Sequence, residues 1–116
     1  MKVELTDKFH EQMILAFPAL LDAEKSIEAV TGVSLSVLRS SDRRKMTSMA
    51  RMIFVEMVSP YVTPQYYVAR YIGRDHATVL YLKRTYKGNY EFDLAFRSVS
   101  DAAFELFNKI RKDGIV

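Results

Sequence analysis

The 116-residue chain has no cysteine and no tryptophan, and only four glycines, three prolines and two histidines. Without cysteine there can be no disulfide, no thiolate metal site and no thiol nucleophile. His10 and His76 lie far apart in the sequence, so an imidazole metal site is not expected either. We therefore expect no metal and no cofactor.

Long apolar runs and β-hairpin signals are also missing. No run is long enough to span a bilayer, and the N-terminal MKVELTDKFHEQ lacks the apolar core of a signal peptide, so a cytoplasmic protein is expected. No Asn-Gly or Asp-Gly pair separates alternating apolar segments. Asp113-Gly114 lies at the end, where it is expected to stop a helix. These absences predict an all-α protein.

Enzyme signatures are absent as well. The sequence has no recognisable Ser/His/Asp set, no glycine-rich phosphate loop and no carboxylate pair on one helix face beyond ordinary acidic positions. We therefore expect no catalytic activity. With 49% hydrophobic residues, the chain can bury a core and is expected to form one domain over residues 1–116.

Charge is distributed unevenly along the chain. Residues 39–87 carry ten Lys and Arg against three Asp and Glu, a net +7, whereas the remaining residues carry a net −4. Contacts with a polyanion are therefore expected in the basic middle, unless the charges only solvate the surface.

Helical spacing of apolar residues predicts about five to seven helices. The first is capped by Thr6 or Asp7 and ends near Pro18, and the next runs from a cap at Asp22 to Gly32. Ser34 opens a short helical turn. A basic loop over residues 39–45 precedes a long central helix that carries four methionines and ends at Ser59-Pro60.

Two helices joined by a tight turn are predicted next. Thr63 and Pro64 open the first, because Thr can bond a free amide and Pro fits the first helical position. Gly73 makes the turn, and the second helix spans about residues 74–87, ending at Lys87-Gly88-Asn89. A last helix is expected within residues 90–113, capped by Ser98 or Ser100.

The run from Gly73 to Tyr81, Gly-Arg-Asp-His-Ala-Thr-Val-Leu-Tyr, resembles the signature of the C-terminal DNA-binding domain of DnaA, the bacterial replication initiator. Residues 32–38, the cluster at 43–45 and residues 50–53 are similar to preceding parts of that domain. The resemblance implies a helix-turn-helix bundle like DnaA and the Trp repressor. Residues 26–87 would form its core, after an N-terminal helical extension over residues 1–25 and before the C-terminal helix over 90–113.

The chain also departs from that family. It has no ATP-binding loop, so it is not a complete initiator. Ala77 replaces a threonine, Met49 stands where an arginine that reaches the minor groove is expected, and the turn before Arg74 is one residue shorter. These differences put the family's particular DNA sequence in doubt.

The predicted base-reading residues open the second helix of the pair. Arg74 offers a fork to guanine, Asp75 can accept from cytosine N4, and His76 can donate to guanine. The methyl groups of Ala77 and Thr78 suit thymine. Asp75 can equally be the N-cap of its helix, bonding the Thr78 amide.

Further residues are predicted to contact the DNA backbone: Arg43, Arg44, Lys45, Arg51, Thr63, Gln65, Lys83 and Arg84. The alternatives that involve no DNA are that the run at 43–45 is a solvated loop and that Arg51 and Arg70 form salt bridges. The tyrosines are expected at the edges of the core rather than as stacking platforms for single strands.

Sequence-specific binding of double-stranded DNA is the predicted function, in replication initiation or transcription regulation in a bacterium. The alternative is a protein-interaction module on the same fold that has lost DNA binding. Its N-terminal helix would then bind a partner or form a homodimer through Phe9, Met13, Phe17, Leu20 and Leu21. A ligand-responsive repressor is a third, weaker hypothesis.

Overall fold

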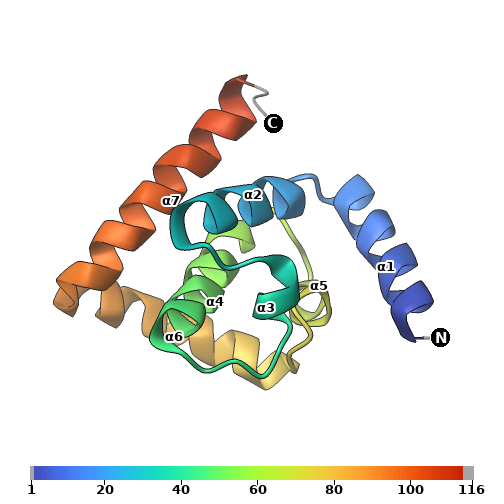
Figure 1. Cartoon of the computed structure of the whole chain (residues 1–116), viewed down its shortest axis with the longest axis horizontal. Coiled ribbons are helices and arrows are strands. Elements are labelled where there is room, and N and C mark those ends of the chain that lie inside the picture. Colours follow the sequence, from blue (N-terminus) through green and yellow to red (C-terminus); the bar gives the residue numbers. More distant parts are fainter. Residues whose placement is uncertain (1, 114–116) are drawn as a thin grey trace.

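The computed structural model describes residues 2–113, and it describes side chains from Lys8 onward (Figure 1). Within that part of the chain every regular element is a helix, which confirms the all-α prediction. The helices are α1 (Lys2–Ala16), α2 (Ala19–Thr31), α3 (Leu35–Leu38), α4 (Lys45–Val58), α5 (Gln65–Tyr71), α6 (His76–Phe92) and α7 (Leu94–Asp113).

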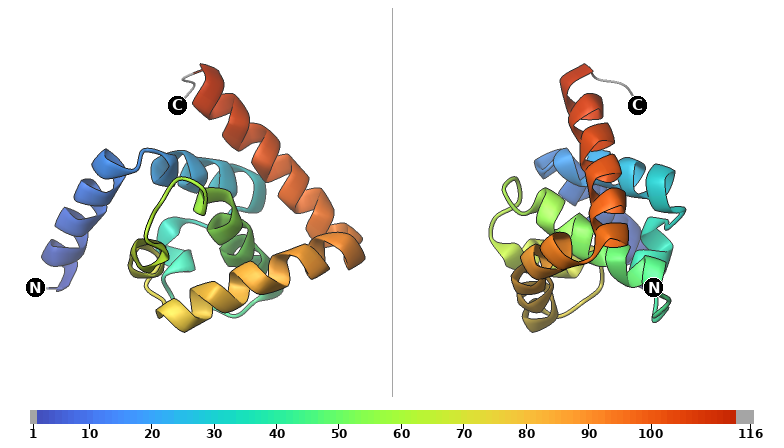
Figure 2. Two further views of the ribbon diagram at one scale, coloured as in Figure 1. Left: turned by 180° about the vertical axis from the view of Figure 1, so that it is seen from behind. Right: turned by 90° about the vertical axis from the view of Figure 1, so that its left-hand side faces the viewer.

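Helix α4 lies inside the bundle, between α2 on one side and α6 on the other, and α7 packs along both α2 and α6 (Figures 1 and 2). Its buried residues include Ile53, Phe54 and Val55, which point in successive directions, so it is covered on more than one side as predicted. One hydrophobic cluster joins these residues to Leu20 of α2 and Phe107 of α7. Helices α1 and α7 lie on opposite sides of the molecule.

Several helix ends follow the local chemistry of the sequence. Gly32 has a left-handed φ of 78° after α2, and the hydroxyl of Ser34 accepts from the Val37 amide at the start of α3. Helix α4 ends at Val58, directly before Ser59-Pro60. These three predictions are confirmed.

Predicted boundaries near the N-terminus are wrong. Helix α1 begins at Lys2, before Thr6 and Asp7, so neither is its N-cap. Helix α2 begins at Ala19 directly after Pro18, which places Asp22 inside its first turn. The boundary expected between residues 25 and 26 also falls within α2.

Two polar contacts fix α7 on its neighbours. The buried hydroxyl of Ser26 on α2 donates to the carbonyl of Ala103. Ser100, also buried, shares a hydrogen bond with the hydroxyl of Tyr86 on α6. Ser100 is therefore a buried contact residue, and the predicted cap of α7 at Ser98 or Ser100 is wrong. Asp93 caps this helix instead, accepting from the Phe96 amide at 3.0 Å.

Helix α1 leans on α2 and α5 through aromatic and polar contacts. The ring of His10 stacks on that of Tyr71 at 5.3 Å, and its Nε2 lies 3.0 Å from a carboxylate oxygen of Glu24. The Tyr71 hydroxyl donates to the same oxygen. Burial raises the pKa of Glu24, and His10 opposes that rise. The guanidinium of Arg70 lies 4.3 Å above the ring of Phe9.

The residues expected to offer the N-terminal helix to a partner are used inside the molecule. Met13 and Leu20 are buried, and Phe9 and Phe17 are half-buried and packed against the core. Leu21 is half-buried too. Met13 and Leu20 are therefore not available to a partner, and Phe9, Phe17 and Leu21 are available only in part.

Candidate nucleic-acid interface

Helices α5 and α6 form the expected helix-turn-helix. Gly73 has a left-handed φ of 67°, which favours glycine because it has no Cβ. Its amide donates to the carbonyl of Arg70 at 3.2 Å, and the Arg74 amide donates to that of Ala69 at 2.9 Å. This pair of bonds defines a Schellman motif, which closes the C-terminal end of α5. The turn at Gly73 is confirmed.

The start of α5 differs from its prediction. Pro64 is the N-cap residue, and no side chain caps the helix, so Thr63 does not bond an amide there. The amide nitrogen of Gln65 donates to the carbonyls of Ser59 and Val62 at 3.2 and 2.9 Å, and its oxygen accepts from the Ser59 hydroxyl. Gln65 therefore secures the preceding loop, and its amide group is engaged there rather than offered to the DNA backbone. Thr63 is exposed.

The N-terminal end of α6 is open to solvent. Asp75 is its N-cap, and the carboxylate accepts from the Thr78 amide at 2.7 Å. That hydrogen bond lowers the pKa of Asp75. His76 and Ala77 are exposed and Thr78 is half-buried, so no other part of the described chain covers this tip. The capping role of Asp75 is confirmed.

Arg74 faces the loop rather than the exposed tip. Its guanidinium donates to the carbonyl of Ser40, 34 residues earlier, and to that of Gly73 at 3.3 Å. The side chain is half-buried. Arg74 therefore links the helix-turn-helix to the basic loop, and the structure does not group it with Asp75, His76 and Ala77.

Arg51 of α4 is buried beneath the basic loop. Its guanidinium donates to four backbone carbonyls, those of Val37, Leu38, Ser40 and Asp42, over distances of 2.7–3.3 Å. Burial lowers the pKa of Arg51, and the nearby positive charge of Arg74 adds to that effect. With only 7% of its surface exposed, Arg51 organises the loop. Its predicted contact with a DNA phosphate, and the alternative of a salt bridge, are both wrong.

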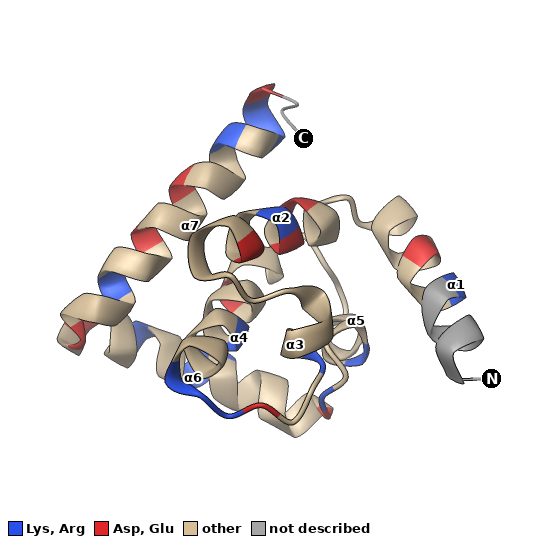
Figure 3. Ribbon diagram, in the orientation of Figure 1, with Lys and Arg blue, Asp and Glu red and all other residues tan. Residues whose placement is uncertain are grey.

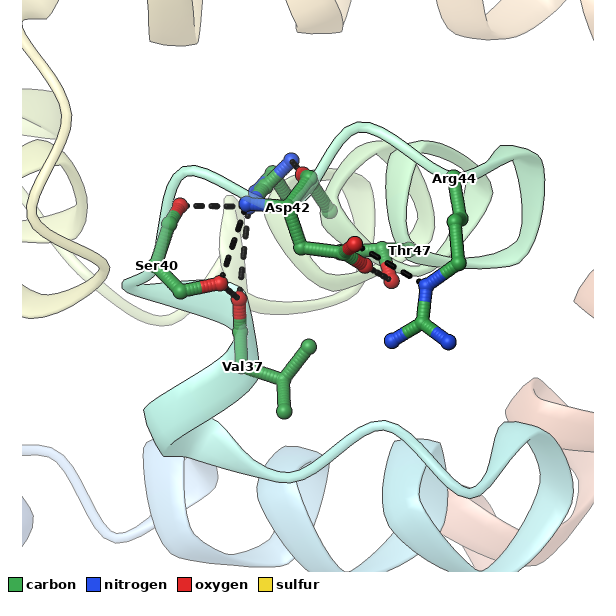
Figure 4. Close-up of polar contacts among 6 residues, drawn as sticks. Val37, Ser40, Asp42, Arg44 and Thr47 are labelled. Atoms are coloured by element: carbon green, nitrogen blue, oxygen red, sulfur yellow. Dashed lines mark hydrogen bonds and ion pairs between the residues drawn. The ribbon is translucent and has the colours of Figure 1, made fainter.

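Side chains of the loop complete its structure (Figure 4). The Ser40 hydroxyl donates to the carbonyl of Val37 at 2.7 Å and accepts from the Asp42 amide at 3.1 Å. The Asp42 carboxylate accepts from the Thr47 hydroxyl and from Arg44 at 2.9 Å. These two bonds lower the pKa of Asp42. The loop is therefore fixed before any ligand arrives.

A groove of about 650 Å³ separates this loop from the first turns of α6. Three arginines line it: Arg43, Arg51 and Arg74. Hydroxyl groups from Ser41, Ser48, Thr78 and Tyr81 line it too, whereas no acidic side chain does. Lys and Arg gather on the same side of the molecule, around the loop before α4 (Figure 3).

The other predicted backbone contacts are scattered around the groove. Arg43, Arg44 and Lys45 are exposed on the loop and the start of α4. Lys83 is half-buried, and Arg84 lines a separate hollow further along α6. Sequence reasoning did not find Ser41, Ser48 and Tyr81, since nothing in their local pattern shows that the fold brings them together.

The tyrosines mostly pack at the edge of the core. Tyr71 is fully buried, and the rings of Tyr86 and Tyr90 stack at 5.9 Å. Tyr66 and Tyr81 are about half exposed, with fractions of 48% and 55%. No continuous row of exposed rings that would bind a single strand emerges from these positions.

No protein-family model, curated protein or solved structure matches the chain. Within residues 2–113, no helix combines the length and apolar character needed to cross a membrane. The described side chains also include no group of three or more His, Cys, Asp or Glu residues able to hold a metal ion.

Proposed function

We propose that the protein binds double-stranded DNA through α5 and α6. The observation that carries this proposal is the exposed N-terminal tip of α6 beside a groove that Arg43 and Arg74 line and no carboxylate lines. A helix-turn-helix places the first residues of its second helix in the major groove, while flanking cations hold the phosphates. The resemblance to the DnaA C-terminal domain supports the same assignment.

The chemistry of the tip favours direct reading of bases. Asp75 accepts from the Thr78 amide of its own helix, and its exposed carboxylate can also accept from cytosine N4. His76 can donate to guanine N7 or O6. Ala77 and the methyl group of Thr78 suit the methyl group of thymine. Arg43, Arg44 and Lys45 would hold phosphates, and Arg74 would face them from the other wall of the groove.

Binding is tested by fluorescence anisotropy with two labelled duplexes, one random and one carrying a DnaA-type box, at two salt concentrations. The best target is selected in parallel from a random library, because the family's box is in doubt for this chain. We expect binding that weakens steeply with salt and a preferred sequence. Absence of binding to every duplex at low salt would contradict the proposal.

Two variants distinguish contacts with the bases from contacts with the phosphates. His76→Ala should reduce the preference for the selected sequence by roughly tenfold or more, with little change on random DNA. Replacing Arg43, Arg44 and Lys45 with Gln should weaken binding to the selected duplex and to the random duplex about equally. An equal loss on every sequence from His76→Ala would exclude direct reading by this side chain.

The alternative remains a protein-interaction module on the same fold. One observation in its favour is that Arg51 is buried and donates to backbone carbonyls rather than to a phosphate. A second is that a half-buried methionine, Met49, stands where the family has an arginine. A protein that binds no duplex but retains this fold would support the alternative.

A further inference from the structure

The corner between α6 and α7 carries two exposed apolar side chains. Phe92 ends α6 and Leu94 begins α7, and 85% and 74% of their surfaces are exposed. Asp93 between them caps α7, so the corner has a defined shape. The corner and the N-terminal tip of α6 lie at opposite ends of the helix (Figure 2). A duplex bound at the tip would therefore leave the corner uncovered.

One helical turn before Phe92, α6 contains a glycine in its interior. Gly88 has no left-handed φ, so the backbone does not require glycine there, and glycine costs a helix stability relative to alanine. A Cβ at this position would meet no atom within 4 Å. The surface above Gly88 is a shallow, open hollow that Phe92 also lines.

A projection and a recess thus lie four residues apart on one face of the same helix. If a second copy packs antiparallel about a two-fold axis across that face, Phe92 of each copy enters the hollow above Gly88 of the other. A two-fold interface requires this kind of self-complementarity, in which the same patch serves on both subunits. We infer that this face of α6 binds a second copy of the chain and forms a homodimer.

Charge at the hollow agrees with that arrangement. Arg84 lines the end nearer the start of α6 and Asp93 the end nearer the corner. Antiparallel packing brings the Arg84 end of one copy beside the Asp93 end of the other, so opposite charges meet at both ends. Dimerisation would also direct Arg84 toward the second copy instead of a phosphate.

The contact is small, because only about one helical turn and the corner take part. Stable interfaces bury roughly 800 Å² on each partner, so a weak, reversible dimer is expected. Sedimentation from about 10 µM to about 1 mM should show the average mass rising above the monomer's 13.4 kDa. A mass that stays at the monomer value throughout this range would overturn the inference.

Phe92→Ala should weaken self-association by about tenfold or more. Leu15→Ala is the matched control, because Leu15 on α1 is 82% exposed yet lies far from the hollow, and it should leave association unchanged. Gly88→Leu should fill the hollow and weaken the dimer, while the Tm of the monomer holds or rises. An equal effect of Leu15→Ala would instead indicate unspecific apolar contact.

The cysteine-free chain allows a direct test of which residues meet. Gly88→Cys and Phe92→Cys proteins are mixed and oxidised, and the mixed disulfide should greatly exceed the two self-paired products. Leu15→Cys provides the control for random collision. A statistical mixture of the three products would contradict the two-fold arrangement. None of these measurements uses DNA, so their failure would leave the proposed DNA binding untouched.

Discussion

Basic residues in the middle of the chain occupy opposite environments: an inner position, held by the buried Arg51, and an outer group, formed by the exposed Arg43, Arg44 and Lys45. Arg51 lies beneath the loop and gives its N–H groups to four carbonyls, whereas Arg44 lies on its outer side with 80% of its side chain exposed. The sequence charge counts both equally. The difference teaches that a positive charge near a predicted DNA-binding helix can serve the fold alone, and that burial decides which role it takes.

The largest effect should come from the inner position. Arg51→Met removes one donor from each of four carbonyls, and we expect it to lower the free energy of unfolding by about 3–5 kcal/mol. Urea unfolding measures this. Arg44→Met, on the outer side of the same loop, should change the value by no more than about 0.5 kcal/mol. Similar losses in the two variants would abolish the distinction between the inner position and the outer group.

A smaller effect is expected at the tip of α6. Asp75→Ala removes the bond to the Thr78 amide and should lower the Tm by roughly 3–6 °C. Asp75→Asn keeps an acceptor there and should retain most of the Tm. Thermal unfolding followed by circular dichroism tests both, and an unchanged Tm in Asp75→Ala would show that the cap contributes nothing.

The same cap makes stability depend on pH. Its hydrogen bond lowers the folded pKa of Asp75 below the unfolded value, so its contribution is present above about pH 4 and is lost as the pH falls further. The Tm should therefore drop more steeply below pH 4 in the wild type than in Asp75→Asn. Glu105→Gln, an exposed change on α7, is the control. Parallel curves for wild type and Asp75→Asn would contradict this assignment.

The smallest effect on the free protein should come from the outer group. Replacing Arg43, Arg44 and Lys45 with Gln should leave the free energy of unfolding within about 0.5 kcal/mol of wild type. If the proposed function is right, the salt dependence of DNA binding should flatten by about 0.9 for each phosphate that the variant no longer neutralises. A stable variant with an unchanged slope would remove these residues from the interface.

Features that depend on neighbours in sequence were predictable. The left-handed turn at Gly73, the caps at Ser34 and Asp75, and the end of α4 each follow from the chemistry of a few adjacent residues. The role of Arg51 was not predictable in this way, because its acceptors lie 9–14 residues away and are backbone atoms. The sequence shows that Arg51 is a cation, but it does not show which backbone carbonyls the fold places around its guanidinium.

The continuation of α6 past its predicted end has a similar cause. Lys87-Gly88-Asn89 reads locally as a stop, but α6 continues to Phe92, and the side-chain amide of Asn89 donates to the carbonyl of Thr85 at 2.9 Å. From α7, Arg97 donates to the carbonyls of Tyr90 and Glu91, both at 2.9 Å. Arg97, which belongs to the next helix, thus gives hydrogen-bond donors to two carbonyls in the last turn of α6 and supports its extension to Phe92.

The hydroxyl contacts of α7 have a consequence for the shape of the corner. Ser26 and Tyr86 each bond a particular point on α7, the carbonyl of Ala103 and the hydroxyl of Ser100. Moving α7 along its axis by a single residue, a step of about 1.5 Å, would break both bonds at once. These two hydrogen bonds therefore fix the position of α7 along its own axis. Its orientation relative to α6 depends on the hydroxyls of Ser26 and Tyr86 as well as on apolar packing.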